Sequence, residues 1–225
     1  MKDDMTYYEV DQIKLSIKQF IMTLQDFAGE NKIVLNQTDV EFFTIISKHI
    51  LFYKYMIQNN EIGRFYNVLI SDCYYYIISI INSEHRYMYV NERSIIENYL
   101  RLITNKTVEQ NHVTDKLFEE IKSMFFSLNE IDFSLIKNEY VTACGYIHGG
   151  KVLDKDLSYT FNACIESERE FKDKNKYYTR MKSVFKMLDY MLIYNYKEDV
   201  SGAFHRRKTL LEYLLGKKCV DILFI

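Results

Sequence analysis

The chain contains no proline in 225 residues and only seven glycines. Proteins on average use about 5% proline and about 7% glycine. These two residues end helices and supply the backbone angles of tight hairpin turns, so their scarcity disfavours a turn-rich β fold. Hydrophobic residues make up 48% of the chain and charged residues 27%, a balance typical of a globular protein with a buried core. The composition therefore predicts an all-α fold of long helices joined by short polar segments.

Apolar residues recur at three- and four-residue steps along most of the chain, as expected for amphipathic helices. The first such stripe covers residues 10–27 and stops before Gly29. The second begins at Thr38, which has Glu41 three residues later, the spacing of a capping box. A later helix is expected to start near Asn91, a residue that suits the N-cap position. We predict a compact bundle of about eight helices that forms a single domain over residues 1–225.

Charge and hydropathy narrow the classes of partner. The net charge of −2 and the isoelectric point near 6.2 give no general attraction to nucleic acid, so contact with RNA would need a local basic patch. The first ten residues, MKDDMTYYEV, lack the apolar run of a secretory signal. The most hydrophobic stretch, residues 66–81, is interrupted by polar residues and is shorter than the roughly 20 residues of a membrane span. We therefore expect a cytoplasmic protein with no membrane partner.

The metal-binding and redox residues are scattered. No CxxC pair occurs, and no two histidines stand at ligand spacing on one helix. The common nucleotide, zinc-peptidase, hydrolase and calcium motifs are also missing. We expect neither a metal nor a cofactor, and we expect the four cysteines to be free thiols: Cys73, Cys144, Cys164 and Cys219.

Two apolar features point to self-association. The consecutive residues Tyr74, Tyr75 and Tyr76 face three directions of one helix, and the C-terminal segment 219–225 is almost entirely apolar. The segment fits a strand, a docked extension or part of an interface. A monomer usually buries such surfaces, so a homodimer is expected.

Two segments in the middle of the chain carry a family resemblance. They are residues 91–99, with sequence NERSIIENY, and residues 146–150, with sequence YIHGG. Together they resemble prokaryotic helical proteins related to the HEPN superfamily, over roughly residues 60–150. The resemblance implies a dimerising helical bundle of a defence or toxin system. Active members of the family cut RNA without a metal ion.

The resemblance also implies roles for three residues. Metal-free RNA cleavage needs a base, an acid and a cation that stabilises the charged phosphorane. His148 would serve as base or acid, Arg93 as the cation, and Glu97 would orient the guanidinium or the imidazole. Ribonuclease members carry a histidine four to six residues after an arginine on one helix, and no arginine here has that spacing. Arg93 and His148 would therefore have to converge from different helices.

Structural interpretations of these residues stay open beside the catalytic one. Arg93, Glu97 and Arg101 follow each other at four-residue steps, which is typical of an exposed face that stabilises its own helix. His148 directly precedes Gly149 and also suits the C-terminal end of a helix, where an imidazolium favours the helix dipole.

A short basic run, Arg206, Arg207 and Lys208, is a candidate for nucleic-acid binding through phosphate contacts. The acids Glu198 and Asp199 lie close by in the sequence and would offset its field. These acids favour the structural interpretation of the run, a solvated helix start, over the binding one.

The sequence supports functions of two classes. The first is a HEPN-like prokaryotic defence or toxin-system protein that acts on or binds RNA, as a metal-independent endoribonuclease. The second is a non-enzymatic helical module that binds a protein partner, such as an antitoxin, a regulator or an inhibitor. The position of Arg93 relative to His148 separates the two.

Overall fold

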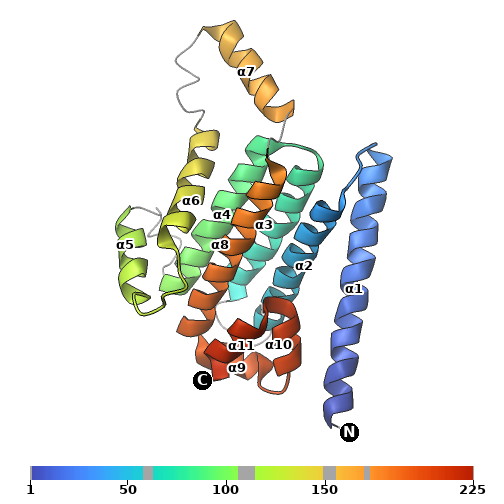
Figure 1. Cartoon of the computed structure of the whole chain (residues 1–225), viewed down its shortest axis with the longest axis vertical. Helices are drawn as coiled ribbons and strands as arrows, with labels where there is room; N and C mark the ends of the chain where they lie inside the picture. Colours follow the sequence, from blue (N-terminus) through green and yellow to red (C-terminus); the bar gives the residue numbers. More distant parts are fainter. Residues whose placement is uncertain (1, 58–62, 106–114, 149–155, 170–172, 225) are drawn as a thin grey trace. The chain divides into compact units, whose positions relative to one another are not determined.

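The structure is a computed structural model that describes residues 2–57, 63–105, 115–148, 156–169 and 173–224. Within these ranges all regular secondary structure is helical and no strand occurs, which confirms the all-α prediction. Figure 1 shows the helices in chain order. Their bounds are α1 Lys2–Glu30, α2 Gln37–Ile57, α3 Gly63–Ile81, α4 His85–Thr104, α5 Asp115–Met124, α6 Phe133–Ile147, α7 Leu157–Arg169, α8 Lys174–Asn195, α9 Lys197–Phe204, α10 Lys208–Leu215 and α11 Lys217–Phe224.

The described ranges hold eleven helices, where the sequence predicts about eight. Most of the difference lies at the C-terminus, where α9, α10 and α11 have eight residues each. Eight residues make little more than two turns, so an apolar stripe has no room to repeat. The apolar tail becomes the docked helix α11, with Cys219 and Leu223 buried.

The contacts divide the chain into two compact units. The terminal unit comprises Met1–Ile70 and Phe185–Ile225, and the central unit comprises Ser71–Val184. The division falls inside α3 and inside α8, so both helices contribute to both units. The prediction of a single domain over residues 1–225 stays a prediction.

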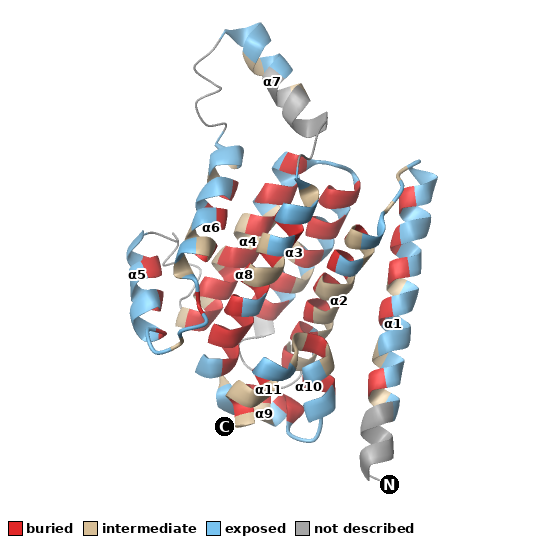
Figure 2. Ribbon diagram, in the orientation of Figure 1, coloured by how far each residue is buried: buried red, intermediate tan, exposed pale blue. Residues whose placement is uncertain are grey.

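The terminal unit is built on α2, which contacts α1, α9 and α10. Its core is aromatic: the rings of Phe52 and Phe204 stack with their centroids 5.7 Å apart, and Tyr53 stacks on Tyr66 at 6.1 Å. In Figure 2 the buried residues of α1 lie on the side that faces α2, and the outer side of α1 is largely exposed. Burial of such large rings supplies most of the driving force for packing.

The start of α2 differs from the predicted capping box. Asn36 accepts a hydrogen bond from the backbone N–H of Asp39 at 3.0 Å, and Asp39 accepts one from the backbone N–H of Asn36 at 3.0 Å. This reciprocal pair satisfies free N–H groups of the first turn and lies two residues before the predicted pair Thr38 and Glu41. Asn36 is as good an N-cap residue as threonine, and the helix begins at Gln37.

The central unit is organised by α4 and α6, which run antiparallel. The guanidinium of Arg86, near the start of α4, donates to the carbonyl of Ile147 at the end of α6 at 3.1 Å. Further along α4, Glu97 accepts a hydrogen bond from the hydroxyl of Tyr140 at 2.8 Å. Helix α4 begins at His85, six residues before the predicted start at Asn91. Among the described residues, no helix is long and apolar enough to cross a membrane.

Candidate functional site

Arg93 and Glu97 lie in a polar cluster between α4 and α6. Arg93 donates from Nε to Glu97 Oε1 at 2.8 Å, and the Tyr140 hydroxyl donates to the same oxygen at 2.8 Å. Arg101 donates from Nη2 to Glu97 Oε2 at 3.3 Å. The two ion pairs sit at four-residue steps on α4, as the sequence spacing predicts. Glu97 is thus the acceptor at the centre of the cluster, and its charge is shared between two guanidinium groups.

His148 lies away from this cluster. It occupies the C-cap position of α6, is exposed, and its backbone N–H donates to the Cys144 carbonyl at 3.0 Å. The end of α6 is level with Arg86, which is seven residues, or about 10 Å, before Arg93 along α4. Among the described side chains, no hydrogen bond or ion pair joins Arg93 to His148. The structure therefore brings Arg93 and Glu97 together but leaves His148 at the end of the neighbouring helix.

A second cluster lies inside the central unit, around Glu92. The Tyr177 hydroxyl donates to Glu92 Oε2 at 2.5 Å and also bonds to the hydroxyl of Tyr76. All three side chains are buried, and they come from α4, α8 and α3 respectively. The chain of hydroxyl groups ends at a carboxyl group that no solvent reaches.

A second buried acid, Glu139 of α6, is held by α8. Arg180 donates from Nε to Glu139 Oε1 at 2.6 Å. One oxygen of each acid, Oε1 of Glu92 and Oε2 of Glu139, has no hydrogen-bond partner among the described residues. Buried polar atoms nearly always have a hydrogen-bond partner. Two buried carboxyl oxygens without one are therefore an unusual feature of the central unit.

The electrostatics of Glu92 follow from its surroundings. Burial raises the pKa of its carboxyl group, the hydrogen bond from Tyr177 lowers the pKa, the charge of Glu139 raises it and that of Arg180 lowers it. Burial dominates, and the pKa reaches about 8 from an ordinary 4.5. The raised pKa favours the neutral form of Glu92 near neutral pH, which is the form that a general acid or a proton store requires.

The basic run is largely engaged by its own unit. Arg207 donates from Nε to Glu9 at 3.0 Å, and its guanidinium lies 5.6 Å from the centroid of the Tyr55 ring. The amine of Lys208 lies 3.7 Å from the centroid of the Phe224 ring. Arg206 is exposed. The offsetting acid is thus Glu9 of α1, and the nucleic-acid role of Arg206, Arg207 and Lys208 stays a prediction.

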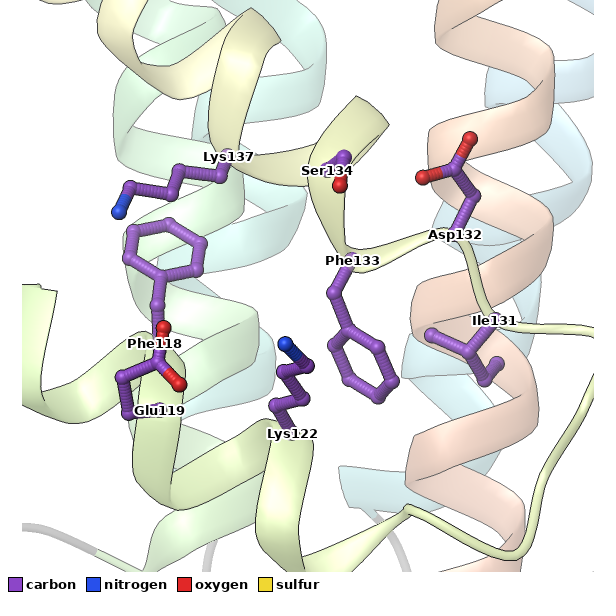
Figure 3. Close-up of a pocket in the computed structure, with 8 residues that line it drawn as sticks. All are labelled: Phe118, Glu119, Lys122, Ile131, Asp132, Phe133, Ser134 and Lys137. Atoms are coloured by element: carbon purple, nitrogen blue, oxygen red, sulfur yellow. The ribbon is translucent and has the colours of Figure 1, made fainter.

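A surface pocket of 290 Å³ opens between α5 and the start of α6. Figure 3 shows the amine of Lys122 reaching between the rings of Phe118 and Phe133. The second lysine of the lining, Lys137, is paired with Asp115 at 2.7 Å. The volume of the pocket is at the lower end of the range for ligand sites, and the charge of Lys137 is already balanced by Asp115. The pocket therefore does not indicate a particular ligand.

The central unit also exposes apolar side chains on the hairpin formed by α3 and α4. Asp72 on α3 accepts hydrogen bonds from Ser94 and Asn98 on α4 at 2.7 and 3.0 Å, which aligns the two helices side by side. On their solvent side the exposed fractions are 61% for Tyr75, 39% for Ile78, 64% for Tyr87 and 39% for Val90. These four residues are called the α3–α4 surface below.

Sequence reasoning missed the buried cluster. Glu92, Glu139, Tyr177 and Arg180 are far apart in the chain, and none belongs to a known motif. One signal was available: Glu92 stands three and four residues before Ile95 and Ile96, so it occupies the apolar phase of its helix. An acid at a position of that phase must be buried and either paired or neutral.

The described residues contain no group of three or more histidine, cysteine, aspartate or glutamate side chains that could hold a metal ion. Comparisons of the chain with protein-family models, with curated proteins and with solved structures gave no match. The HEPN resemblance therefore stays a prediction from residues 91–99 and 146–150, and any function has to be argued from the geometry above.

Proposed function

We propose that this chain is a non-enzymatic helical interaction module that pairs with a second copy of itself through the α3–α4 surface. The observation that carries the proposal is the exposure of four large apolar side chains, Tyr75, Ile78, Tyr87 and Val90, on two adjacent helices. Large apolar residues gathered on one surface are typical of interaction sites in soluble proteins. The position of His148, about two helical turns from Arg93 along the α4–α6 pair, supports the interaction class over the enzymatic one.

The charge distribution favours a second copy as the partner. Between Cys73 and Asn82, α3 contains no charged residue. In a two-fold interface each patch contacts an identical patch of the second copy. A charged residue near the two-fold axis would therefore lie close to the same charge on the partner and be repelled by it. The α3 half of the surface avoids that repulsion, and the hydroxyls of Tyr75 and Tyr87 can stay hydrated at the rim. Two such hairpins packed face to face would form a four-helix arrangement.

Sedimentation equilibrium at micromolar concentration tests this proposal. We expect the wild-type protein to be a dimer and the double variant Tyr75→Glu, Tyr87→Glu to be a monomer, because each substitution places like charges across the two-fold axis. The matched control is Tyr159→Glu on α7, which also replaces an exposed tyrosine of the central unit and should leave the dimer intact. A monomeric wild type, or a double variant that still dimerises, would contradict the proposal.

RNA cleavage is a second candidate, favoured by one observation. Arg93, Glu97 and His148 lie on two neighbouring helices, α4 and α6, and Arg93 keeps part of its guanidinium exposed. If this pair of helices cuts RNA, Arg93→Ala and His148→Ala should each lower the rate by about 10²- to 10⁴-fold, and a chelator should have no effect. The control Lys217→Ala should change the rate little. Wild-type protein that neither binds nor cuts RNA would leave only the interaction module.

A further inference from the structure

We propose that Glu92 is a proton-binding site of the central unit, that it is held there as a neutral acid, and that loss of its proton weakens the packing of α4 against α3 and α8. The site takes a proton as its ligand, and neither candidate function uses it. The inference does not depend on the α3–α4 surface, so either proposal can fail alone.

The charges of the groups around Glu92 favour a proton on its carboxyl group. The groups around Glu92 are Tyr76 from α3, Tyr89 from α4, Glu139 from α6, and Tyr177 and Arg180 from α8. Three of these are neutral phenols, one is an acid, and only Arg180 carries a positive charge. Two buried carboxylates beside one guanidinium would leave a net negative charge in a medium that solvates it poorly.

The hydrogen bonds decide which acid carries the proton. Glu139 has an ion pair with Arg180 at 2.6 Å and is therefore the ionised member. Among the described residues Glu92 has no ion pair, its Oε2 accepts a hydrogen bond from the Tyr177 hydroxyl, and its Oε1 has no hydrogen-bond partner. An unpartnered oxygen of a neutral acid costs less than an unpartnered oxygen of a carboxylate, because the charged form loses far more hydration.

The consequence for stability has a definite sign. The pKa of Glu92 in the folded chain is about 8, above its ordinary value of 4.5, so between these pH values the folded chain binds more protons than the unfolded chain. Stability then falls as pH rises through this window and levels off above it. One proton corresponds to at most about a tenfold loss in the folding equilibrium constant per pH unit.

The experiment measures the urea denaturation of the wild type, Glu92→Gln and Glu119→Gln. The pH is varied from about 5 to about 9, which covers most of the range between the unfolded and folded pKa values of Glu92. Glutamine keeps the shape of a neutral glutamic acid, so Glu92→Gln should fold, lose the one-proton pH dependence and be at least as stable as the wild type above pH 8. Glu119 is an exposed acid of the same unit, and its variant should keep the wild-type pH profile.

A second measurement reads the proton directly. In carbon NMR of protein with labelled glutamate carboxyl groups, one carboxyl signal should titrate near pH 8, and it should be absent from Glu92→Gln. Glu139→Gln should shift that midpoint downwards, because the like charge that raises the pKa of Glu92 is removed. A Glu92→Gln variant that keeps the full pH dependence overturns the proposal. If that variant does not fold, a wild-type spectrum with no carboxyl midpoint above neutrality overturns it instead.

Discussion

The two units bury acids in different ways. In the terminal unit, Asp189 of α8 is buried against His49 of α2, with Oδ2 and Nε2 2.8 Å apart. In the central unit, Glu92 and Glu139 are both buried, and Arg180 pairs with Glu139 alone of the two. Asp189 thus has a cationic partner, whereas Glu92 has no ion pair among the described residues. The comparison of these two acids teaches that a counter-ion and a retained proton are alternative ways to bury a carboxyl group.

The protonation state of His49 follows from its two neighbours. Nδ1 lies 2.8 Å from the Ile45 carbonyl oxygen and Nε2 lies 2.8 Å from the Asp189 carboxylate. Both neighbours only accept hydrogen bonds, so both ring nitrogens must donate, and the ring is an imidazolium. Burial by itself lowers the pKa of His49, but the charge and hydrogen bond of Asp189, with the Ile45 carbonyl, raise it above its ordinary value.

The largest expected effect is that of Asp189→Asn. The substitution removes the counter-ion of a buried imidazolium, and breaking one partner of a buried pair costs about 3 to 5 kcal/mol. Urea denaturation at pH 6, below the ordinary pKa of histidine at about 6.5, measures the loss. The comparison with Glu92→Gln tests the difference between the units. Replacing the buried acid by its amide should lower the stability of the folded chain for Asp189 and should not lower it for Glu92. A loss below about 1 kcal/mol for Asp189→Asn would break the comparison.

A smaller loss is expected for Glu97→Gln. Glu97 is the shared acceptor of Arg93, Arg101 and Tyr140, so neutralising it removes the negative charge that two part-buried guanidinium groups contact. Hydrogen bonds to charged groups contribute about 1.5 to 3 kcal/mol, which sets the expected loss at about 2 kcal/mol. Tyr140→Phe is the matched control for the neutral donor and should cost about 1 kcal/mol. Equal stability of Glu97→Gln and the wild type would show that this cluster contributes nothing.

The terminal unit should show a pH dependence that a single proton of His49 limits. Because the pKa of His49 is raised in the folded chain, its contribution is complete below the ordinary histidine pKa of 6.5 and is lost as pH rises through the folded value. The slope is at most about 1.4 kcal/mol per pH unit. Comparing His49→Gln with the wild type above pH 6.5 isolates this contribution. Parallel pH profiles of the two proteins would contradict a charged His49.

Local patterns predicted the helices well because a helix is specified by neighbours in the chain. The stripe over residues 10–27 lies within α1, and Arg93, Glu97 and Arg101 pair at four-residue steps as expected. The start of α4 was misplaced by six residues for a physical reason. Glu92 interrupts the apolar stripe that Met88 and Ile95 belong to, so the stripe appears to begin only after it.

Contacts between residues far apart in the chain could not be predicted from the sequence pattern. Tyr177 reaches Glu92 from 85 positions away, and His49 meets Asp189 across 140 positions. Such pairs depend on which helices pack together, and no local pattern records that. The same limit applies to the basic run, because Glu9 lies 198 positions from Arg207 and no spacing rule links them.

The smallest expected effect on stability is that of the ion pair between Arg207 and Glu9. The side chain of Arg207 is 44% exposed, so water screens its interaction with Glu9. Exposed ion pairs typically contribute about 0.2 to 1 kcal/mol, and salt weakens them further. We therefore expect Arg207→Ala and Glu9→Gln each to lower stability by less than about 1 kcal/mol, with a double-mutant coupling that shrinks at high salt. A coupling above about 2 kcal/mol that salt leaves unchanged would place this pair beside His49 and Asp189 as a buried interaction, and exposure would no longer explain the difference between them.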